Sequence, residues 1–229
     1  MSKFNTISLD AADTLFYIKK GLGDTYNGVL KKYADNYDSK NISASFKKHF
    51  SNRKGLSFQG LSGDKLYSAE RDWWHCLVKD MFSELGMFDR FEDYFDDLYN
   101  HFKFDAWEIY DDTIPFLKEL KNRNYKIIIT SNFDSRIYNV CDGFGISEYI
   151  DYFTISSKSG CAKPTKEFFM KSLKNSNSNI ENTIHVGDNP ELDYKAAKKI
   201  GLKAFLIDRE NKSNEQYIID SLISLLGKI

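Results

Sequence analysis

Short apolar runs alternate with longer helical patterns over much of the chain. Five runs rich in apolar and β-branched residues predict buried strands at residues 4–9, 126–131, 152–156, 183–187 and 203–208. Helical patterns lie at residues 113–120, 135–143, 164–173, 190–200 and 217–226. Strands that alternate with helices are typical of βαβ units. The sequence therefore predicts an α/β fold with a Rossmann-like parallel sheet flanked by helices.

The segment between the first two predicted strands has a different pattern. Apolar residues recur there at intervals of three to four, as in Phe88, Phe91, Phe95, Leu98 and Phe102. A long helical run at 64–85 ends at Gly86, a residue that often terminates helices. We therefore predict a core domain at 1–18 and 106–229, with an all-helical cap domain at 19–105 inserted after the first strand.

Composition narrows the class of partner. The chain has 229 residues, of which 41% are apolar, and its 32 Lys and Arg nearly balance 33 Asp and Glu. This balance argues against nucleic acid or an anionic membrane as partner and favours a small molecule. No stretch approaches the roughly 18 apolar residues of a membrane span, and no apolar signal core follows Met1. We expect a cytoplasmic protein.

Polar residues stand where four of the predicted strands end. They are Asp10 after the first strand, Ser131 and Asn132 at the second, Lys163 after the third, and Asp188 with Asp193 after the fourth. The carboxyl ends of parallel strands share one edge of a sheet, so these side chains should converge. A carboxylate can attack a phosphoryl group, and Mg²⁺ offsets the repulsion between the two anions. The pattern favours Mg²⁺-dependent hydrolysis of a small phosphorylated metabolite.

Four motifs together carry a resemblance to a known family. They are D-A-A-D-T-L-F at 10–16, T-S-N at 130–132, A-K-P at 162–164 and G-D-N-P-E-L-D at 187–193. In this order they resemble the motifs of the haloacid dehalogenase superfamily, whose helical cap type has an insert directly after the first motif. The runs S-N-F-D-S-R at 131–136 and H-V-G-D-N at 185–189, with the pair Trp73 and Trp74, are similar to the eukaryotic group that contains the rhythmically expressed gene two protein.

The resemblance implies a role for each matching residue. Asp10 would be the nucleophile that forms an aspartyl-phosphate, and Lys163 would take part in catalysis. The remaining implied roles are phosphate binding by Ser131, Asn132 and Lys163, Mg²⁺ binding by Asp10, the Ala12 carbonyl and Asp188, and support by Asp193 and Thr14.

Ala12 departs from the pattern of the family's phosphatases. They carry a second aspartate two residues after the nucleophile, which protonates the leaving group. Thr14 and Leu15 fix the register, so Asp13 lies one residue too far along to inherit that role and is interpreted as a loop residue. Loss of a general acid typically slows a reaction about 10²- to 10⁴-fold. We therefore expect a slow phosphatase that depends on a good leaving group.

Three other functions remain open at this point. A dehalogenase needs no such acid, but dehalogenases of the superfamily usually lack the acidic motif at 187–193. A phosphonatase would need a cap lysine as a Schiff base, for which Lys47, Lys48 and Lys54 are candidates. A catalytically reduced protein could instead bind a phosphometabolite or a protein partner.

Three further residues have structural interpretations. His185 lies within a predicted strand, and we expect a hydrogen-bonded core histidine rather than a base. Trp73 and Trp74 lie about 100° apart on a helix. One should therefore pack in the core of the cap and the other at its edge, and neither is expected to form a ligand platform.

Overall fold

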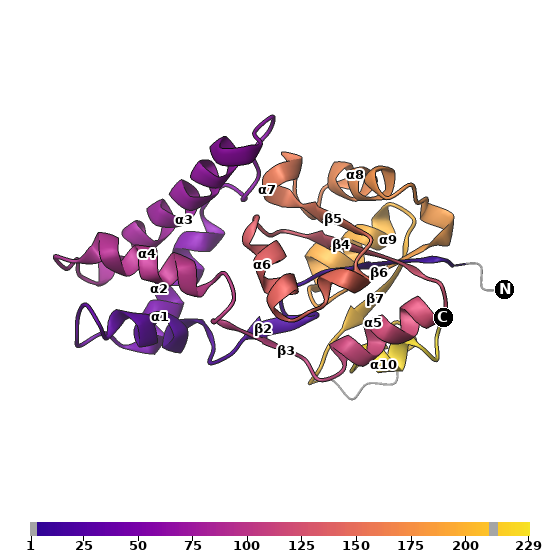
Figure 1. The fold of residues 1–229 in the computed structure, drawn as a ribbon, viewed down its shortest axis with the longest axis horizontal. Helices are drawn as coiled ribbons and strands as arrows, with labels where there is room; N and C mark the ends of the chain where they lie inside the picture. Colours follow the sequence, from indigo (N-terminus) through magenta and orange to yellow (C-terminus); the bar gives the residue numbers. More distant parts are fainter. Residues whose placement is uncertain (1–3, 211–214) are drawn as a thin grey trace.

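A six-stranded parallel sheet forms the centre of the computed structural model, which describes residues 4–210 and 215–229 (Figure 1). The strands follow the order β5-β4-β1-β6-β7-β8. Their bounds are β1 Thr6–Leu9, β4 Lys126–Ser131, β5 Tyr152–Ile155, β6 Thr183–Gly187, β7 Lys203–Ile207 and β8 Ile218–Ile219. The predicted α/β fold with a parallel sheet is confirmed.

Strand β1 lies where the strand order reverses. Leu9 of β1 pairs with Ile129 of β4 on one side and with Val186 of β6 on the other. Strands β4 and β5 extend the sheet in one direction, and β6 to β8 extend it in the other. In open α/β sheets, ligands bind at the carboxyl ends of the strands beside such a reversal. Asp10, the residue after β1, occupies this position.

Helices cover both faces of the sheet, and the side chains on the two faces of β1 have different surroundings. The helical segments of the core are α5 Thr113–Asn122, α6 Arg136–Gly143, η1 Ser147–Tyr149, α7 Ser156–Ser159, α8 Lys166–Asn175, η2 Ile180–Asn182, the π-helix η3 Pro190–Lys195, α9 Ala196–Lys199 and α10 Leu222–Leu225. Ile7 and Leu9 point into an apolar cluster with side chains of α5, α6 and α10. Since successive strand residues face opposite sides, Ser8 faces the other layer, where its hydroxyl meets Thr130 and His185.

A separate group of helices follows the first strand and lies beside the sheet (Figure 1). They are α1 Leu22–Leu30, α2 Ser39–Ser51, α3 Gly63–Leu85 and α4 Phe91–His101. They pack around an aromatic-rich cluster that contains Phe91, Phe95, Leu98 and Phe102 from the predicted periodic series. We call this group the cap. Within the described residues, no helix has both the length and the apolar character needed to cross a membrane.

Local sequence explains where two cap helices begin and end. The side chain of Asp38 accepts hydrogen bonds from the backbone N–H groups of Lys40 and Asn41, which caps the start of α2. Helix α3 ends at Gly86, whose φ of 116° lies in a region that side chains disfavour. The expected stop at Gly86 is therefore observed.

A short antiparallel ribbon that the sequence analysis did not predict joins the cap to the core. Strand β2 Phe16–Ile18 pairs with β3 Trp107–Ile109, and Ile18 lies opposite Trp107. Three-residue strands are too short to give a periodic signal. Their pairing links residues 89 to 93 positions apart, which local pattern cannot indicate.

The predicted helix at 217–226 is wrong. Its first part forms strand β8, because the edge of β7 binds it: Leu206 N–H donates to Tyr217 O and Asp208 N–H to Ile219 O. Ser221 then caps a new helix by accepting a hydrogen bond from Ser224 N–H, so α10 begins only at Leu222. The free sheet edge outweighed the local helical pattern.

Candidate active site

Asp10 begins a tight loop at the end of β1. Its backbone N–H donates to Val186 O of β6, at 2.9 Å between N and O, which fixes the start of the loop against the sheet. The carbonyl of Ala11 then accepts from the N–H groups of Thr14, Leu15 and Phe16. Asp13 has a left-handed φ of 58°, a conformation that aspartate tolerates better than most residues. The loop therefore turns sharply while the Asp10 carboxylate stays at the strand end.

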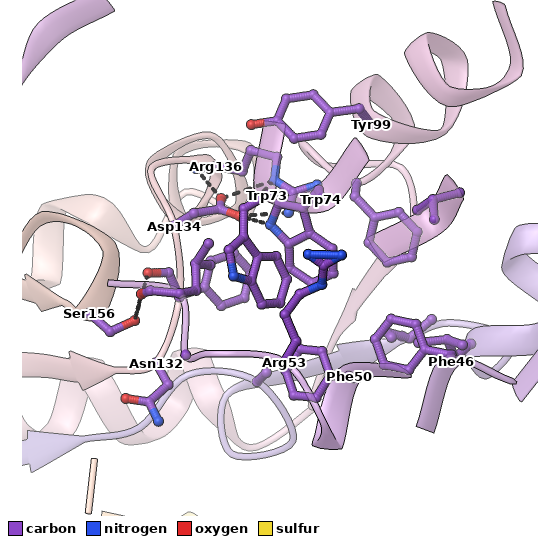
Figure 2. A pocket seen from close by; sticks show the side chains of 18 of the residues that line it. Phe46, Phe50, Arg53, Trp73, Trp74, Tyr99, Asn132, Asp134, Arg136 and Ser156 are labelled. Atoms are coloured by element: carbon purple, nitrogen blue, oxygen red, sulfur yellow. Dashed lines mark hydrogen bonds and ion pairs between the residues drawn. The ribbon is translucent and has the colours of Figure 1, made fainter. Parts of the chain in front are cut away.

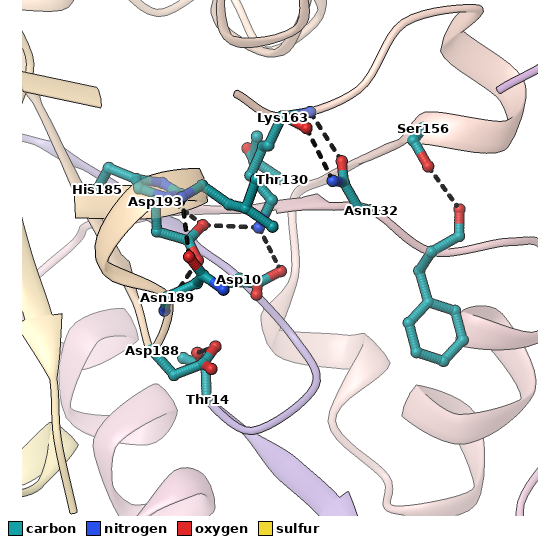
Figure 3. Close-up of polar contacts among 12 residues, drawn as sticks. Asp10, Thr14, Thr130, Asn132, Ser156, Lys163, His185, Asp188, Asn189 and Asp193 are labelled. Atoms are coloured by element: carbon teal, nitrogen blue, oxygen red, sulfur yellow. Dashed lines mark hydrogen bonds and ion pairs between the residues drawn. The ribbon is translucent and has the colours of Figure 1, made fainter. Parts of the chain in front are cut away.

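Lys163 lies in the segment that follows β5 and contacts Asp10 at the end of β1. Its Nζ lies 2.7 Å from Asp10 Oδ1 and 2.6 Å from Asp193 Oδ1 (Figure 3). The Lys163 and Asp193 side chains are almost fully buried, and that of Asp10 is 12% exposed. Burial alone would lower the pKa of Lys163, but the charges of Asp10 and Asp193 outweigh it and raise that pKa. The ammonium group is therefore a fixed cation between two carboxylates.

Asn132 holds the backbone of Lys163. Its Nδ2 donates to Lys163 O at 3.0 Å, and its Oδ1 accepts from Lys163 N–H at 2.8 Å. This pair of bonds positions Lys163 relative to the end of β4. The structural role that the sequence left open for Asn132 is thus present, whereas its contact with phosphate stays a prediction.

Asp193 is held from several directions. Its Oδ1 accepts from His185 Nε2 at 3.0 Å, and its Oδ2 accepts from Asn189 N–H at 3.3 Å. Burial would raise the pKa of Asp193, but the charge of Lys163 and the hydrogen bond from His185 lower it to about 2. A Cβ on Gly187 would lie only 2.3 Å from Asp193 Cγ, so this close approach requires glycine.

His185 is a core residue, as the sequence analysis expected. Its ring is fully buried, with Nδ1 at 2.9 Å from Ser8 Oγ. The Ser8 hydroxyl also bonds Thr130 Oγ1 at 2.9 Å, which in turn contacts Ser172 Oγ at 2.6 Å. These buried hydroxyl groups hold the His185 ring in place, and His185 in turn bonds Asp193.

Asp188 completes a cluster of carboxylates. One oxygen from each of Asp10, Asp188 and Asp193 lies within 4.8 Å of the others. Burial, then the charges of Asp10, Asp193 and Asp13, raise the pKa of Asp188 to about 7. Burial also raises the pKa of Asp10, although Lys163 and a hydrogen bond with Ser131 oppose this shift. Thr14 Oγ1 donates to Asp188 Oδ1 at 3.3 Å.

The cluster has the chemistry of a Mg²⁺ site. Both oxygens of Asp193 are engaged, by Lys163, His185 and the N–H of Asn189, whereas Asp10 contacts Lys163 through Oδ1. The candidate ligands are therefore the carboxylates of Asp10 and Asp188 and the backbone carbonyl of Ala12. Mg²⁺ prefers a few protein oxygens of this kind. A divalent cation bound here would favour the ionised form of Asp188 and oppose the burial and the neighbouring negative charges that raise its pKa.

A cavity of about 440 Å³ begins at Lys163, beside this cluster, and extends to side chains of the cap. Figure 2 shows many of the side chains that line it. At the core end it is lined by Ala12, Asp13, Asn132 and Lys163. At the cap end its lining is mainly aromatic and includes Phe46, Phe50, Trp73, Trp74, Phe95 and Tyr99. We call this the aromatic cavity. The expectation that one of Trp73 and Trp74 packs in the core of the cap and the other at its edge is wrong, because both are half-buried and line this cavity, with ring centroids 4.9 Å apart.

Buried polar contacts join the cap to the core beside this cavity. Glu70 of α3 accepts from Ser135 N–H and Oγ at 3.1 and 2.8 Å. Trp74 Nε1 donates to Asp134 Oδ2 at 2.6 Å (Figure 2). The guanidinium of Arg136 pairs with Asp134. The sequence pattern of the run at 131–136 did not indicate this junction, because its partners in α3 lie 60 or more positions away.

Known proteins share the sequence and the fold. A family model described as haloacid dehalogenase-like hydrolase matches residues 4–201. The chain is 23% identical over 234 residues to haloacid dehalogenase-like hydrolase domain-containing protein 3 of Danio rerio, covering 96% of this chain and 94% of that one. It is 24% identical to rhythmically expressed gene 2 protein of Drosophila melanogaster, covering 92% and 85% of the two chains.

Solved structures agree at the level of the fold. The putative HAD-hydrolase YfnB from Bacillus subtilis, described as bound to magnesium, has a TM-score of 0.76 at 16% identity, with 99% of both chains covered. L-2-haloacid dehalogenase from Xanthobacter autotrophicus has a TM-score of 0.70 at 15% identity, with 97% and 96% covered. With the four motifs gathered at one sheet edge and a family match over most of its length, the chain belongs to the haloacid dehalogenase-like hydrolase family.

Proposed function

We propose that this protein is a Mg²⁺-dependent hydrolase of a small phosphate ester and that Asp10 is its nucleophile. The observation that carries the proposal is the arrangement around Lys163, whose ammonium lies 2.7 Å from Asp10 beside the carboxylate cluster. A buried cation and a metal site next to one carboxylate suit the transfer of an anionic group. The volume of the cavity, about 440 Å³, favours a small phosphorylated metabolite.

The chain's own residues account for the two steps. A carboxylate oxygen of Asp10 forms a bond to phosphorus while the bond to the leaving oxygen breaks and its electron pair departs with that oxygen. Water then cleaves the aspartyl-phosphate, which releases inorganic phosphate and restores the carboxylate. Lys163 and the Ser131 hydroxyl would hold phosphoryl oxygens during both steps, and Asn132 and Asp193 would keep Lys163 in place.

Mg²⁺ would be held by Asp10, Asp188 and the Ala12 carbonyl, with Thr14 and Asp193 as supporting residues. Bound there, it would supply charge compensation between the nucleophile and the phosphoryl group. The chain residues around it have to remain ionised for this purpose, and Lys163 keeps Asp193 ionised by lowering its pKa.

Phosphonatase chemistry finds less support. Among the described residues, Lys163 is the single lysine that lines the aromatic cavity. Lys48, one of the three cap lysines considered, instead forms an exposed pair with Glu84 on the outside of the cap. A Schiff base needs a lysine amine that faces the bound substrate, so the phosphate ester remains the preferred substrate.

The test is hydrolysis of p-nitrophenyl phosphate by the wild type and Asp10→Asn, with Mg²⁺ and with a chelator. Nitrophenolate leaves without a proton, so the absence of an acid at Ala12 should matter little. We expect turnover that requires both Mg²⁺ and Asp10. Equal rates for the two proteins, with both shown to be folded by circular dichroism, would refute the proposal.

A further inference from the structure

We propose that the substrate is a phosphate monoester of an uncharged aromatic alcohol of the phenol type, and that its ring occupies the aromatic cavity. This inference rests on the proposed phosphohydrolase function and adds the class of substrate. Three independent features of the structure carry it: the shape and lining of the cavity, the pairing of its charged residues, and the alanine at position 12.

The cavity leads from the proposed phosphate position directly into a set of rings. Lys163 lines its core end, so a phosphate held there points its ester group toward the cap. Phe46 and Trp74 are nearly parallel with centroids 6.5 Å apart, whereas Trp73 and Trp74 meet edge to face. Faces and edges of this kind are the surfaces that a further aromatic ring prefers to contact. Figure 2 shows Phe46, Trp73 and Trp74 among the side chains that line the cavity.

The two arginines in the cavity wall are already paired with carboxylates. The Arg136 guanidinium is bound to Asp134 at 2.6 Å and lies over the rings of Trp74 and Tyr99. The Arg53 guanidinium lies 2.6 Å from Asp80 and faces Trp73. An anionic leaving group would have to lose its hydration there without gaining an unpaired cation of the cap, which is unfavourable. An uncharged aromatic group loses little hydration and gains ring contacts.

Ala12 independently favours a phenol-type leaving group. Phenols ionise near pH 10, as tyrosine does, whereas water ionises near 15.7 and aliphatic alcohols resemble water. A phenolate can therefore depart with the electron pair of the broken P–O bond and take its proton from solvent afterwards. An alkoxide needs a proton as it leaves, and a methyl group at position 12 cannot supply one.

Asp13 is the other carboxyl group that lies near the position of the leaving group. It lines the same cavity, and burial followed by the charge of Asp10 raises its pKa. Its N–H is bound to Phe16 O at 2.7 Å, so the loop holds Asp13 in the left-handed turn. If it donated a proton, removal of its acid would slow esters of aliphatic alcohols selectively.

Three substrates separate ring recognition from leaving-group chemistry. These are 1-naphthyl phosphate, 1-naphthylmethyl phosphate, which keeps the ring but has an aliphatic alcohol, and acetyl phosphate, which has a good leaving group and no ring. We expect kcat/KM for 1-naphthyl phosphate to exceed that for acetyl phosphate at least about tenfold. 1-Naphthylmethyl phosphate should be cleaved at least about 10²-fold more slowly. It should still inhibit competitively, with an inhibition constant close to the Michaelis constant for the naphthyl ester.

Two cap variants and one loop variant complete the test. Phe50→Ala should raise KM for 1-naphthyl phosphate several-fold, and because Phe50 is 46% exposed its truncation should not prevent folding. Tyr67→Ala is the matched control, an exposed aromatic residue of α3 that lies outside the cavity lining, and should change nothing. Asp13→Asn should leave the ratio between the two naphthyl substrates unchanged.

Each contrary result has a distinct meaning. Equal kcat/KM for acetyl and 1-naphthyl phosphate, with no effect of Phe50→Ala, would overturn ring recognition and leave the phosphohydrolase intact. Fast cleavage of 1-naphthylmethyl phosphate, or its selective loss in Asp13→Asn, would overturn the leaving-group argument. If no substrate were cleaved faster than by Asp10→Asn, the proposed function itself would fail, and the substrate class with it.

Discussion

The two ends of the aromatic cavity differ in chemistry, since charged residues surround one end and aromatic rings line the other. At the core end, Asp10, Lys163 and Asp193 are buried charges held by short polar contacts. At the cap end, the lining consists mostly of rings that contact one another in stacked, tilted and edge-to-face arrangements. The core end therefore depends on charge balance and direction, whereas the cap end depends on shape and apolar area.

The two ends should therefore differ in the substitutions that they tolerate. A buried charge that loses its partner destabilises the protein strongly because it cannot be rehydrated. A ring that loses one neighbour keeps its other contacts, and the loss scales with the area exposed. We thus expect changes at the core end to abolish function and changes at the cap end to alter preference.

The strongest test of the core end is Lys163→Met, which keeps much of the stem and removes the charge. It leaves Asp10 and Asp193 buried together without a cation, so the free energy of unfolding should fall by about 3–5 kcal/mol. Activity with p-nitrophenyl phosphate should fall by at least about 10²- to 10³-fold. Urea unfolding and initial rates measure the two effects. Lys166→Met, at an exposed position of the same segment, is the control and should match the wild type.

Ala12→Asp tests how far the leaving group compensates for the absent acid. The new carboxyl should raise kcat/KM for 1-naphthylmethyl phosphate by about 10²-fold. For 1-naphthyl phosphate the gain should be no more than a few-fold, since phenolate needs no proton. Steady-state rates with both esters give the answer. In Ala12→Asn the side chain has nearly the shape of aspartate but no acidic proton. An equal gain in that variant would show that the effect is not acid catalysis.

Mg²⁺ should stabilise the folded protein through the core end alone. At a free concentration tenfold above its Kd, the ion should add about 1.4 kcal/mol to the free energy of unfolding. For a chain of this size that corresponds to a rise in Tm of about 3–6 °C. Thermal scans should show this rise in the wild type and its loss in Asp188→Asn. Glu191→Gln, which changes an exposed carboxylate of η3, should keep it.

The smallest effect is expected at the junction of cap and core. Burial raises the pKa of Glu70, so the folded protein favours its neutral form, and the wild type loses stability as pH rises through that raised pKa. Glu70→Gln can still accept from Ser135 and carries no charge. It should be more stable at neutral pH by less than about 1 kcal/mol, with the difference vanishing as pH falls toward the ordinary range of glutamate. Chemical unfolding at several pH values measures this trend, with the exposed Glu181→Gln as control.

The sequence predicted the core end well because its signals are local. Asp10, Ser131, Lys163 and Asp188 each follow or end an apolar run, and parallel strands bring such positions to one edge. The predicted strands therefore sufficed to place these residues near one another. The failure at 217–226 shows the limit, since an open sheet edge decided the conformation there.

The cap end was much harder to predict. The helical period indicated that Trp73 and Trp74 lie on different sides of α3, but it could not show that a cavity lies between the helix and the core. Glu70 and Ser135 are 65 positions apart, and the contact depends on how the cap sits on the core. Such contacts between distant segments leave no periodic trace in a single sequence.

The β2–β3 ribbon gives the cap the properties of an exchangeable module. Ile18 and Trp107 are paired, and Lys19 N–H donates to Ala106 O at 2.9 Å, so the chain leaves and re-enters the core one strand spacing apart. An insert of different length or composition can be joined at the same two points without moving the core strands. Recombination or protein engineering at this ribbon would thus replace the cap end of the cavity in one step and leave the residues around Asp10 unchanged.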